Sequence, residues 1–97
     1  RSPTSLKITL RHLREARNHT LPDVLATDYR LACRCLDGDD FAEGVRAALI
    51  DKDNRPVWTP ARVEDVRASA VNAHFEPLGL GLDLELPSRE QMQKARV

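Results

Sequence analysis

Aromatic side chains are scarce in this chain of 97 residues, and neither sign of charge is in excess. Only four residues are aromatic: Tyr29, Phe41, Trp58 and Phe75. A core of this composition must consist mainly of Leu, Val, Ile and Ala, which favours packed helices, and the length suffices for one small domain. The 15 basic residues balance the 15 acidic residues. Neutral charge gives no general electrostatic case for nucleic-acid binding.

Cysteine is also rare, because the chain contains only Cys33 and Cys35. Two positions apart in a predicted helix, their side chains point to different faces, so a mutual disulfide is geometrically poor. We expect reduced thiols in a reducing compartment. The histidines at positions 12, 19 and 74 show no metal-ligand spacing, so we expect neither a metal site nor a cofactor. The sequence lacks a long apolar run, so no membrane contact and no signal peptide are expected.

The first predicted helix begins at Ser2 and Pro3. Serine is a favourable N-cap, and proline is favoured at the first helical position. Three leucines then recur at helical spacing and form an apolar stripe: Leu6, Leu10 and Leu13. The helix is expected to end near Asn18 and His19.

A second helix is predicted from Thr20, which is followed three residues later by the acidic Asp23 in a near capping box. Four side chains share its main apolar face: Leu25, Tyr29, Ala32 and Leu36. Neighbouring apolar residues widen this face, so the helix is expected to be buried on more than one side. Asp37 and Gly38 end it.

The third helix is predicted from Asp39 or Asp40, either of which suits the N-cap. An apolar stripe follows at positions 41, 45 and 49. Gly44 lies inside this stripe, where glycine costs about 1 kcal/mol relative to alanine. The glycine indicates either the close approach of another backbone or simple tolerance. The turn-forming residues 51–54 end the helix.

Less regular structure is expected beyond residue 54. Pro56 and Pro60 restrict the chain and keep Trp58 in an extended segment. Thr59 and Pro60 are also predicted to start a further short helix through Val66, and Ser69 to cap another that carries Phe75. Leucines alternate with glycine or acidic residues over 80–86, which predicts a short strand or an extended segment. The predicted fold class is therefore mainly α with a short extended tail.

The loop after the third helix holds the candidate ligand-binding residues, Lys52, Arg55 and Trp58. Cations beside an aromatic ring can receive an adenine or a phosphate; the alternative is that Trp58 packs against its own domain. The start of the first helix, with Lys7 nearby, offers a second possible phosphate contact, for which helix capping is the alternative. Glu43 and Arg46 are expected to form an ion pair. No catalytic constellation is predicted.

Two ordered motifs carry a family resemblance. The first is Ser-Pro-Thr-Ser-Leu-Lys-Ile-Thr-Leu-Arg at residues 2–11. The second is Glu-Gly-Val-Arg-Ala at 43–47, continued by Ile-Asp-Lys-Asp at 50–53 and Pro-x-Trp-x-Pro at 56–60. With the later His-Phe-Glu-Pro-Leu at 74–78, they resemble the C-terminal region of the 3-hydroxyisobutyryl-CoA hydrolase family, a branch of the crotonase (enoyl-CoA hydratase) superfamily.

The resemblance implies a small helical C-terminal domain over residues 1–78, followed by an extended or partly disordered tail over 79–97. Family members act in valine breakdown in mitochondria, and their catalytic acidic residues and oxyanion-hole glycines precede the region represented here. The chain begins inside a family motif without an initiator Met, so it is expected to be part of a longer protein. Its role would be structural and active-site-closing. The implied partners are the N-terminal crotonase core or another subunit, and acyl-CoA through the parent protein.

Two alternatives belong to other functional classes. Relatives of this family serve as non-enzymatic proteins of the mitochondrial small ribosomal subunit, which would make ribosomal proteins or rRNA the partners. Twelve of the basic residues are arginines, a bias compatible with that alternative and also with high-GC coding. Another crotonase activity, that of a hydratase or isomerase, fits the motifs at 50–60 less well.

Overall fold

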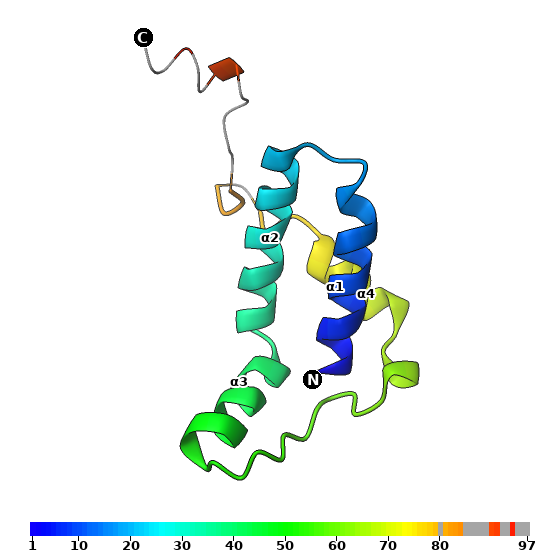
Figure 1. Cartoon of the computed structure of the whole chain (residues 1–97), viewed down its shortest axis with the longest axis vertical. Coiled ribbons are helices and arrows are strands. Elements are labelled where there is room, and N and C mark those ends of the chain that lie inside the picture. Colours follow the sequence, from blue (N-terminus) through cyan, green and yellow to red (C-terminus); the bar gives the residue numbers. More distant parts are fainter. Residues whose placement is uncertain (80, 85–89, 92–93, 95–97) are drawn as a thin grey trace.

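Two long helices connected by a short turn form the frame of the molecule, α1 (Pro3–Ala16) and α2 (Leu21–Leu36). The computed structural model describes residues 1–79, 81–84, 90–91 and 94. The two helices run antiparallel (Figure 1). The short helix α4 (Ala68–Phe75) packs against both of them, and α3 (Asp39–Val45) continues from the end of α2. The fold is mainly α, as predicted.

The predicted caps of the first two helices are confirmed. The Ser2 hydroxyl accepts a hydrogen bond from the Ser5 backbone N–H at 3.3 Å, and the Thr20 hydroxyl accepts one from the Asp23 N–H at 3.3 Å. Each bond satisfies one backbone donor that the first helical turn leaves free. The sequence therefore determined where these helices begin.

The third helix differs from the prediction at its start and in its last turn. Gly38 is its N-cap, while Asp39 and Asp40 lie in the first turn. After Val45 the helix continues as a π-helical turn, Arg46–Ile50 (η1), in which the Asp51 N–H donates to the Arg46 carbonyl at 2.8 Å. The predicted Asp caps are wrong because the Asp40 carboxylate binds groups outside its own helix.

The helix predicted from Thr59 and Pro60 is absent from the described structure. Residues 59–62 form bends, the Thr59–Pro60 peptide bond is cis, and a single 3₁₀ turn, Val63–Asp65 (η2), follows. The Thr59 N–H donates to Asp40 at 2.9 Å, so a contact with α3 replaces the expected helix start. Helix α4 begins one residue before the predicted cap, with Arg67 as its N-cap.

A small hydrophobic cluster lies between α1, α2, α4 and the segment that precedes α4. Its buried members are Ile8, Leu31, Val66 and Val71, with Cys35 and Phe75 packed against it. Polar and aromatic contacts reinforce the packing. The Lys7 ammonium donates to the Val66 carbonyl at 3.0 Å, and the Arg11 guanidinium lies 4.0 Å from the centre of the Phe75 ring.

Most of the apolar stripe predicted for each long helix is exposed. On α1, Leu13 is 65% exposed while Ile8, on the flank of the stripe, is 4% exposed. On α2, Leu36 is 58% exposed while Leu31 is 7% exposed. The chain therefore buries the flanks of its helices and leaves the main apolar faces uncovered.

The segment after α4 returns to α2 through two arginines. Arg30 donates to the Asp83 carboxylate and to the Phe75 carbonyl, both at 2.9 Å, and Arg34 donates to the carbonyls of Glu76 and Pro77. Residues 81–83 form a turn and a bend, so the short strand or extended segment predicted over 80–86 is wrong there. Residues 80 and 85–86 of that prediction, and much of the predicted tail at 79–97, lie outside the described residues.

Candidate functional site

A groove of about 820 Å³ lies between the start of α1, helix α3 and the loop of residues 51–59. We refer to residues 51–59 as the Trp58 loop. The lining of the groove is mainly apolar and includes Ile8, Phe41, Val45, Leu49 and Trp58. Two of these residues, Phe41 and Leu49, are 51% and 68% exposed. A second concavity, between α1 and α2, is smaller, at about 350 Å³.

Trp58 forms one wall of the groove, and Gly44 lies beneath its ring. A Cβ atom on Gly44 would lie 3.5 Å from Cη2 and 3.7 Å from Cζ3 of Trp58. The sequence predicted close approach or tolerance at Gly44. The neighbour is a side chain of the following loop, so the predicted approach of another backbone is wrong. The Trp58 ring packs over Gly44 of its own domain, and its role in ligand contact stays a prediction.

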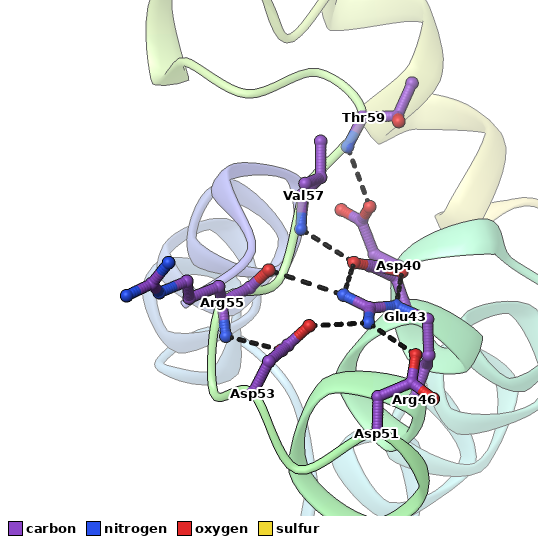
Figure 2. Close-up of polar contacts among 8 residues, drawn as sticks. All are labelled: Asp40, Glu43, Arg46, Asp51, Asp53, Arg55, Val57 and Thr59. Carbon is purple, nitrogen blue, oxygen red and sulfur yellow. Dashed lines mark hydrogen bonds and ion pairs between the residues drawn. The ribbon is translucent and has the colours of Figure 1, made fainter.

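Arg46 is the centre of the hydrogen-bond network that holds the Trp58 loop against α3 (Figure 2). Its Nε and Nη2 atoms form a bidentate pair with Glu43, both bonds being 2.7 Å long. Nη1 donates to Asp51 and Asp53 at 2.8 Å, and Nη2 donates to the Arg55 carbonyl at 3.3 Å. The predicted pairing of Glu43 with Arg46 is confirmed, and two further carboxylates join it.

Carboxylates also bind the backbone of the loop directly. The N–H groups of Arg55, Val57 and Thr59 donate to Asp53, Glu43 and Asp40, at 2.8, 2.8 and 2.9 Å. These three amides belong to alternate residues, which face the same way in an extended segment. Asp40 and Glu43 belong to α3, so their side chains attach the second half of the loop to that helix, whereas Asp53 lies within the loop itself.

The hydrogen bonds of the network shift the pKa values of three of its residues. The hydrogen bonds from Arg46 and from the Val57 N–H lower the pKa of Glu43 to about 2. The same guanidinium and the Arg55 N–H lower the pKa of Asp53, and the surrounding carboxylates raise the pKa of Arg46. All these groups remain charged at neutral pH, so the network holds the loop with charge-assisted hydrogen bonds.

The structure separates the three predicted ligand-binding residues. Trp58 lines the groove, whereas neither Lys52 nor Arg55 is among the residues that line it. Both cations are exposed on the Trp58 loop, and the Arg55 side chain points away from the Arg46 network (Figure 2). Lys52 has a positive φ of 55°. No hydrogen bond or ion pair of either side chain occurs within the described part of the chain, so both charges face solvent there.

The Asp40 carboxylate disfavours phosphate binding at the start of α1, the second possible phosphate contact. The Ser2 hydroxyl donates to the Asp40 carboxylate while it accepts from Ser5. A carboxylate at this helix terminus already occupies the place where an anion would be stabilised by the helix dipole. Ser2 is thus a cap and a link to α3, in agreement with the capping interpretation.

Across residues 1–79 and the short described stretches beyond, no group of three or more His, Cys, Asp or Glu side chains has metal-binding geometry. His12 contacts Asp28 and so links α1 to α2. In the same residues, no helix is both long and apolar enough to cross a membrane.

Sequence reasoning missed the roles of three carboxylates, Asp40, Asp51 and Asp53. They were assigned to capping and turn formation, which are local roles. The available signal was the density of acidic residues around one arginine between positions 39 and 53. An arginine with this many acidic neighbours can satisfy several donors at once.

Comparison with known proteins agrees with the family resemblance of the sequence motifs. A family model described as enoyl-CoA hydratase/isomerase matches residues 1–75. The mitochondrial 3-hydroxyisobutyryl-CoA hydrolases of Rattus norvegicus and Homo sapiens are each 55% identical to the chain over 78 residues, which is 80% of this chain and 20% of theirs. The 3-hydroxyisobutyryl-CoA hydrolase 1 of Arabidopsis thaliana is 44% identical over 94% of this chain and 25% of its own length.

A solved structure extends the similarity to three dimensions. The crystal structure of a carnitinyl-CoA dehydratase from Mycobacterium thermoresistibile matches with a TM-score of 0.74 and 37% identity, over 84% of this chain and 23% of that one. The chain therefore spans between a fifth and a quarter of the length of these relatives.

Proposed function

The chain belongs to the enoyl-CoA hydratase/isomerase family, and we propose that it is the C-terminal helical part of a mitochondrial 3-hydroxyisobutyryl-CoA hydrolase. In this proposal the chain stabilises the catalytic core and closes the active site, while residues outside it cleave the thioester in valine breakdown. The identity to the rat hydrolase supports this substrate over that of a dehydratase. The mitochondrial location is proposed on the same ground.

One observation carries the structural role. The leucines of α1 that form the predicted stripe, Leu6, Leu10 and Leu13, are 43%, 49% and 65% exposed in a chain whose buried core is small. Contiguous exposed apolar surface marks a contact with another protein surface. We assign that contact to the catalytic core of the same protein, because the chain covers only 20% of the rat relative's length.

The Trp58 loop is the part of the chain that we assign to acyl-CoA contact. Trp58 offers an apolar ring beside the groove, and Lys52 and Arg55 offer cations on the same loop. Aromatic rings and cations suit the adenine and the phosphates of CoA. In this assignment the three residues help to bind the nucleotide end of acyl-CoA and take no part in thioester cleavage.

A chimera tests the proposal. The segment of the rat hydrolase that matches this chain is replaced by the chain, and hydrolysis of 3-hydroxyisobutyryl-CoA is followed through release of the free CoA thiol. We expect an active, folded chimera, and an inactive or insoluble rat protein when the segment is simply deleted. Equal activity in the deleted protein, or thioesterase activity of the chain alone, would overturn the structural role.

The hydrogen bonds of three arginines weaken the case for the ribosomal alternative. Three of the twelve arginines, Arg30, Arg34 and Arg46, donate to carbonyls or carboxylates of this chain. Guanidinium groups engaged in this way are less available to phosphates. The alternative remains a prediction, and co-sedimentation of the parent protein with mitochondrial ribosomal subunits would revive it.

A further inference from the structure

We propose that Arg46 is a positioning residue that sets the conformation of the Trp58 loop, and that its guanidinium does not itself bind a ligand. Arg46 is conspicuous in the sequence as a cation in a family motif, which invites assignment as a phosphate-binding residue. The geometry points to a different role. The consequence for acyl-CoA binding rests on the proposed function above, whereas the positioning role does not.

The donors of Arg46 are fully used within the chain. A guanidinium carries five N–H donors, and Arg46 makes five hydrogen bonds, one through Nε and two each through Nη1 and Nη2. Four of them end on carboxylates and one on a carbonyl. A phosphate could bind Arg46 only by displacing one of these partners, so within the Trp58 loop Lys52 and Arg55 are the cations left for a ligand.

The network attaches the loop at its start, near its middle and at Val57. Asp51 and Asp53 lie where the chain leaves the π-helical turn, and the Arg55 carbonyl follows. Glu43 then extends the attachment, because one of its oxygens accepts from both Arg46 and the Val57 N–H. Arg46 therefore orients the carboxylate that holds the residue next to Trp58.

Regular secondary structure does not fix the conformation of the Trp58 loop. Residues 52–57 form no helix or strand, and Lys52 and Asn54 both have a φ of +55°, in the left-handed region. Non-glycine residues adopt that region only when surrounding contacts favour it. The Asn54 N–H donates to the Ala47 carbonyl at 2.9 Å, and the Arg46 network binds Asp51 and Asp53, the residues that precede each of these two positions.

Lysine is expected to be a poor replacement for Arg46. An ammonium offers three donors from one point, whereas the guanidinium fork serves Glu43 through two parallel bonds and still reaches Asp51 and Asp53. Arg46→Lys keeps the charge and removes the geometry. The substitution therefore separates positioning from simple electrostatic attraction.

The first experiment measures hydrogen–deuterium exchange of the peptide that covers residues 51–59, in the chain and in the rat chimera. We expect the amides of Arg55, Val57 and Thr59 to exchange about tenfold faster or more in Arg46→Lys, because exchange reports local opening. Asp53→Ala removes one arm of the network from an exposed loop position and is expected to have a smaller effect in the same direction. Arg62→Lys is the matched control, since among the described residues the Arg62 side chain forms a single, exposed pair, with Glu64.

The second experiment measures hydrolysis by the chimera. We expect Arg46→Lys to raise KM for the acyl-CoA several-fold and to leave kcat within about twofold, because the chemistry lies outside this segment. Faster loop exchange with an unchanged KM would support the positioning role and refute acyl-CoA contact by the loop. An inactive chimera would count against the proposed function. It would leave the positioning role intact, because the exchange measurement on the chain does not use the chimera.

Unchanged loop exchange in both Arg46→Lys and Asp53→Ala would overturn the inference. If Arg46→Lys also accelerates exchange throughout α1 and α2, the variant has lost its fold, and Asp53→Ala then decides. A rise in KM for the acyl-CoA in Arg46→Lys, with unchanged loop exchange, would identify Arg46 as a ligand residue instead.

Discussion

Replacement of Gly44 by alanine is expected to stabilise the chain, although glycine at this position lies directly under Trp58. A Cβ atom would meet the Trp58 ring at 3.5 and 3.7 Å, which is ordinary van der Waals contact. Gly44 has helical backbone geometry within α3, where glycine is about 1 kcal/mol less favourable than alanine. The substitution should therefore increase the free energy of unfolding by about 0.5–1 kcal/mol.

Urea and thermal unfolding followed by circular dichroism at 222 nm measure this change. For a domain of this size, 1 kcal/mol corresponds to a Tm shift of about 4–8 °C. Ala42→Gly is the matched control, because Ala42 is exposed on the same helix, and it should cost about 1 kcal/mol. The fluorescence of Trp58, the single tryptophan, should keep its emission maximum in Gly44→Ala.

A destabilised Gly44→Ala variant with red-shifted Trp58 emission would refute this reasoning. Such a result would mean that the Trp58 ring cannot accept one added methyl group, so that close packing, and not mere tolerance, requires the glycine. Gly44→Leu is expected to give that behaviour, because its longer side chain would occupy the place of the ring. The two substitutions together locate the space available under Trp58.

Three further outcomes are expected. Ser2→Ala removes a helix cap and the link to Asp40, and should cost about 1 kcal/mol in urea unfolding; equal stability would contradict the capping role. The pKa of Glu43 is lowered to about 2 in the folded chain, so its stabilising effect is present above its unfolded value of about 4.3 and is lost as the pH falls toward 2; Glu43→Gln should flatten the stability profile over that interval, and an unchanged profile would refute the assignment. Ile8→Ala should cost about 2–5 kcal/mol, because Ile8 is buried in the small core, and near-native α-helical circular dichroism with an unchanged unfolding midpoint would contradict that packing.

The helices of this protein could be predicted because their signals are local. Ser2, Thr20 and the Asp37–Gly38 turn act on backbone groups within a few residues of themselves, and each appears in the structure where the sequence places it. The predictions failed where distant groups decide. The helix expected at Thr59 does not form, and the Thr59 N–H binds Asp40, which lies 19 residues away.

The candidate site was predictable in its parts and not in its arrangement. The motifs at 43–60 identified Glu43, Arg46 and Trp58, and the spacing of Glu43 and Arg46 predicted their pairing. The motifs did not indicate that Asp51 and Asp53 would join that pair, because charged residues after a helix usually face solvent. Nor did they show that Lys52 and Arg55 would lie outside the groove that Trp58 lines.

The exposed apolar stripes show that hydrophobic periodicity need not identify a chain's own core. On α1 the regularly spaced leucines are exposed and the flanking Ile8 is buried; on α2 the same relation holds for Leu36 and Leu31. A helix stripe indicates which face is buried in the functional assembly, and the assembly here extends beyond this chain in our proposal. Substituting Leu10 with serine should therefore cost the isolated chain little, since Leu10 is 49% exposed, and should destabilise the chimera. An equal effect in both proteins would show that the stripe belongs to the chain's own fold and would remove the main support for docking on a catalytic core.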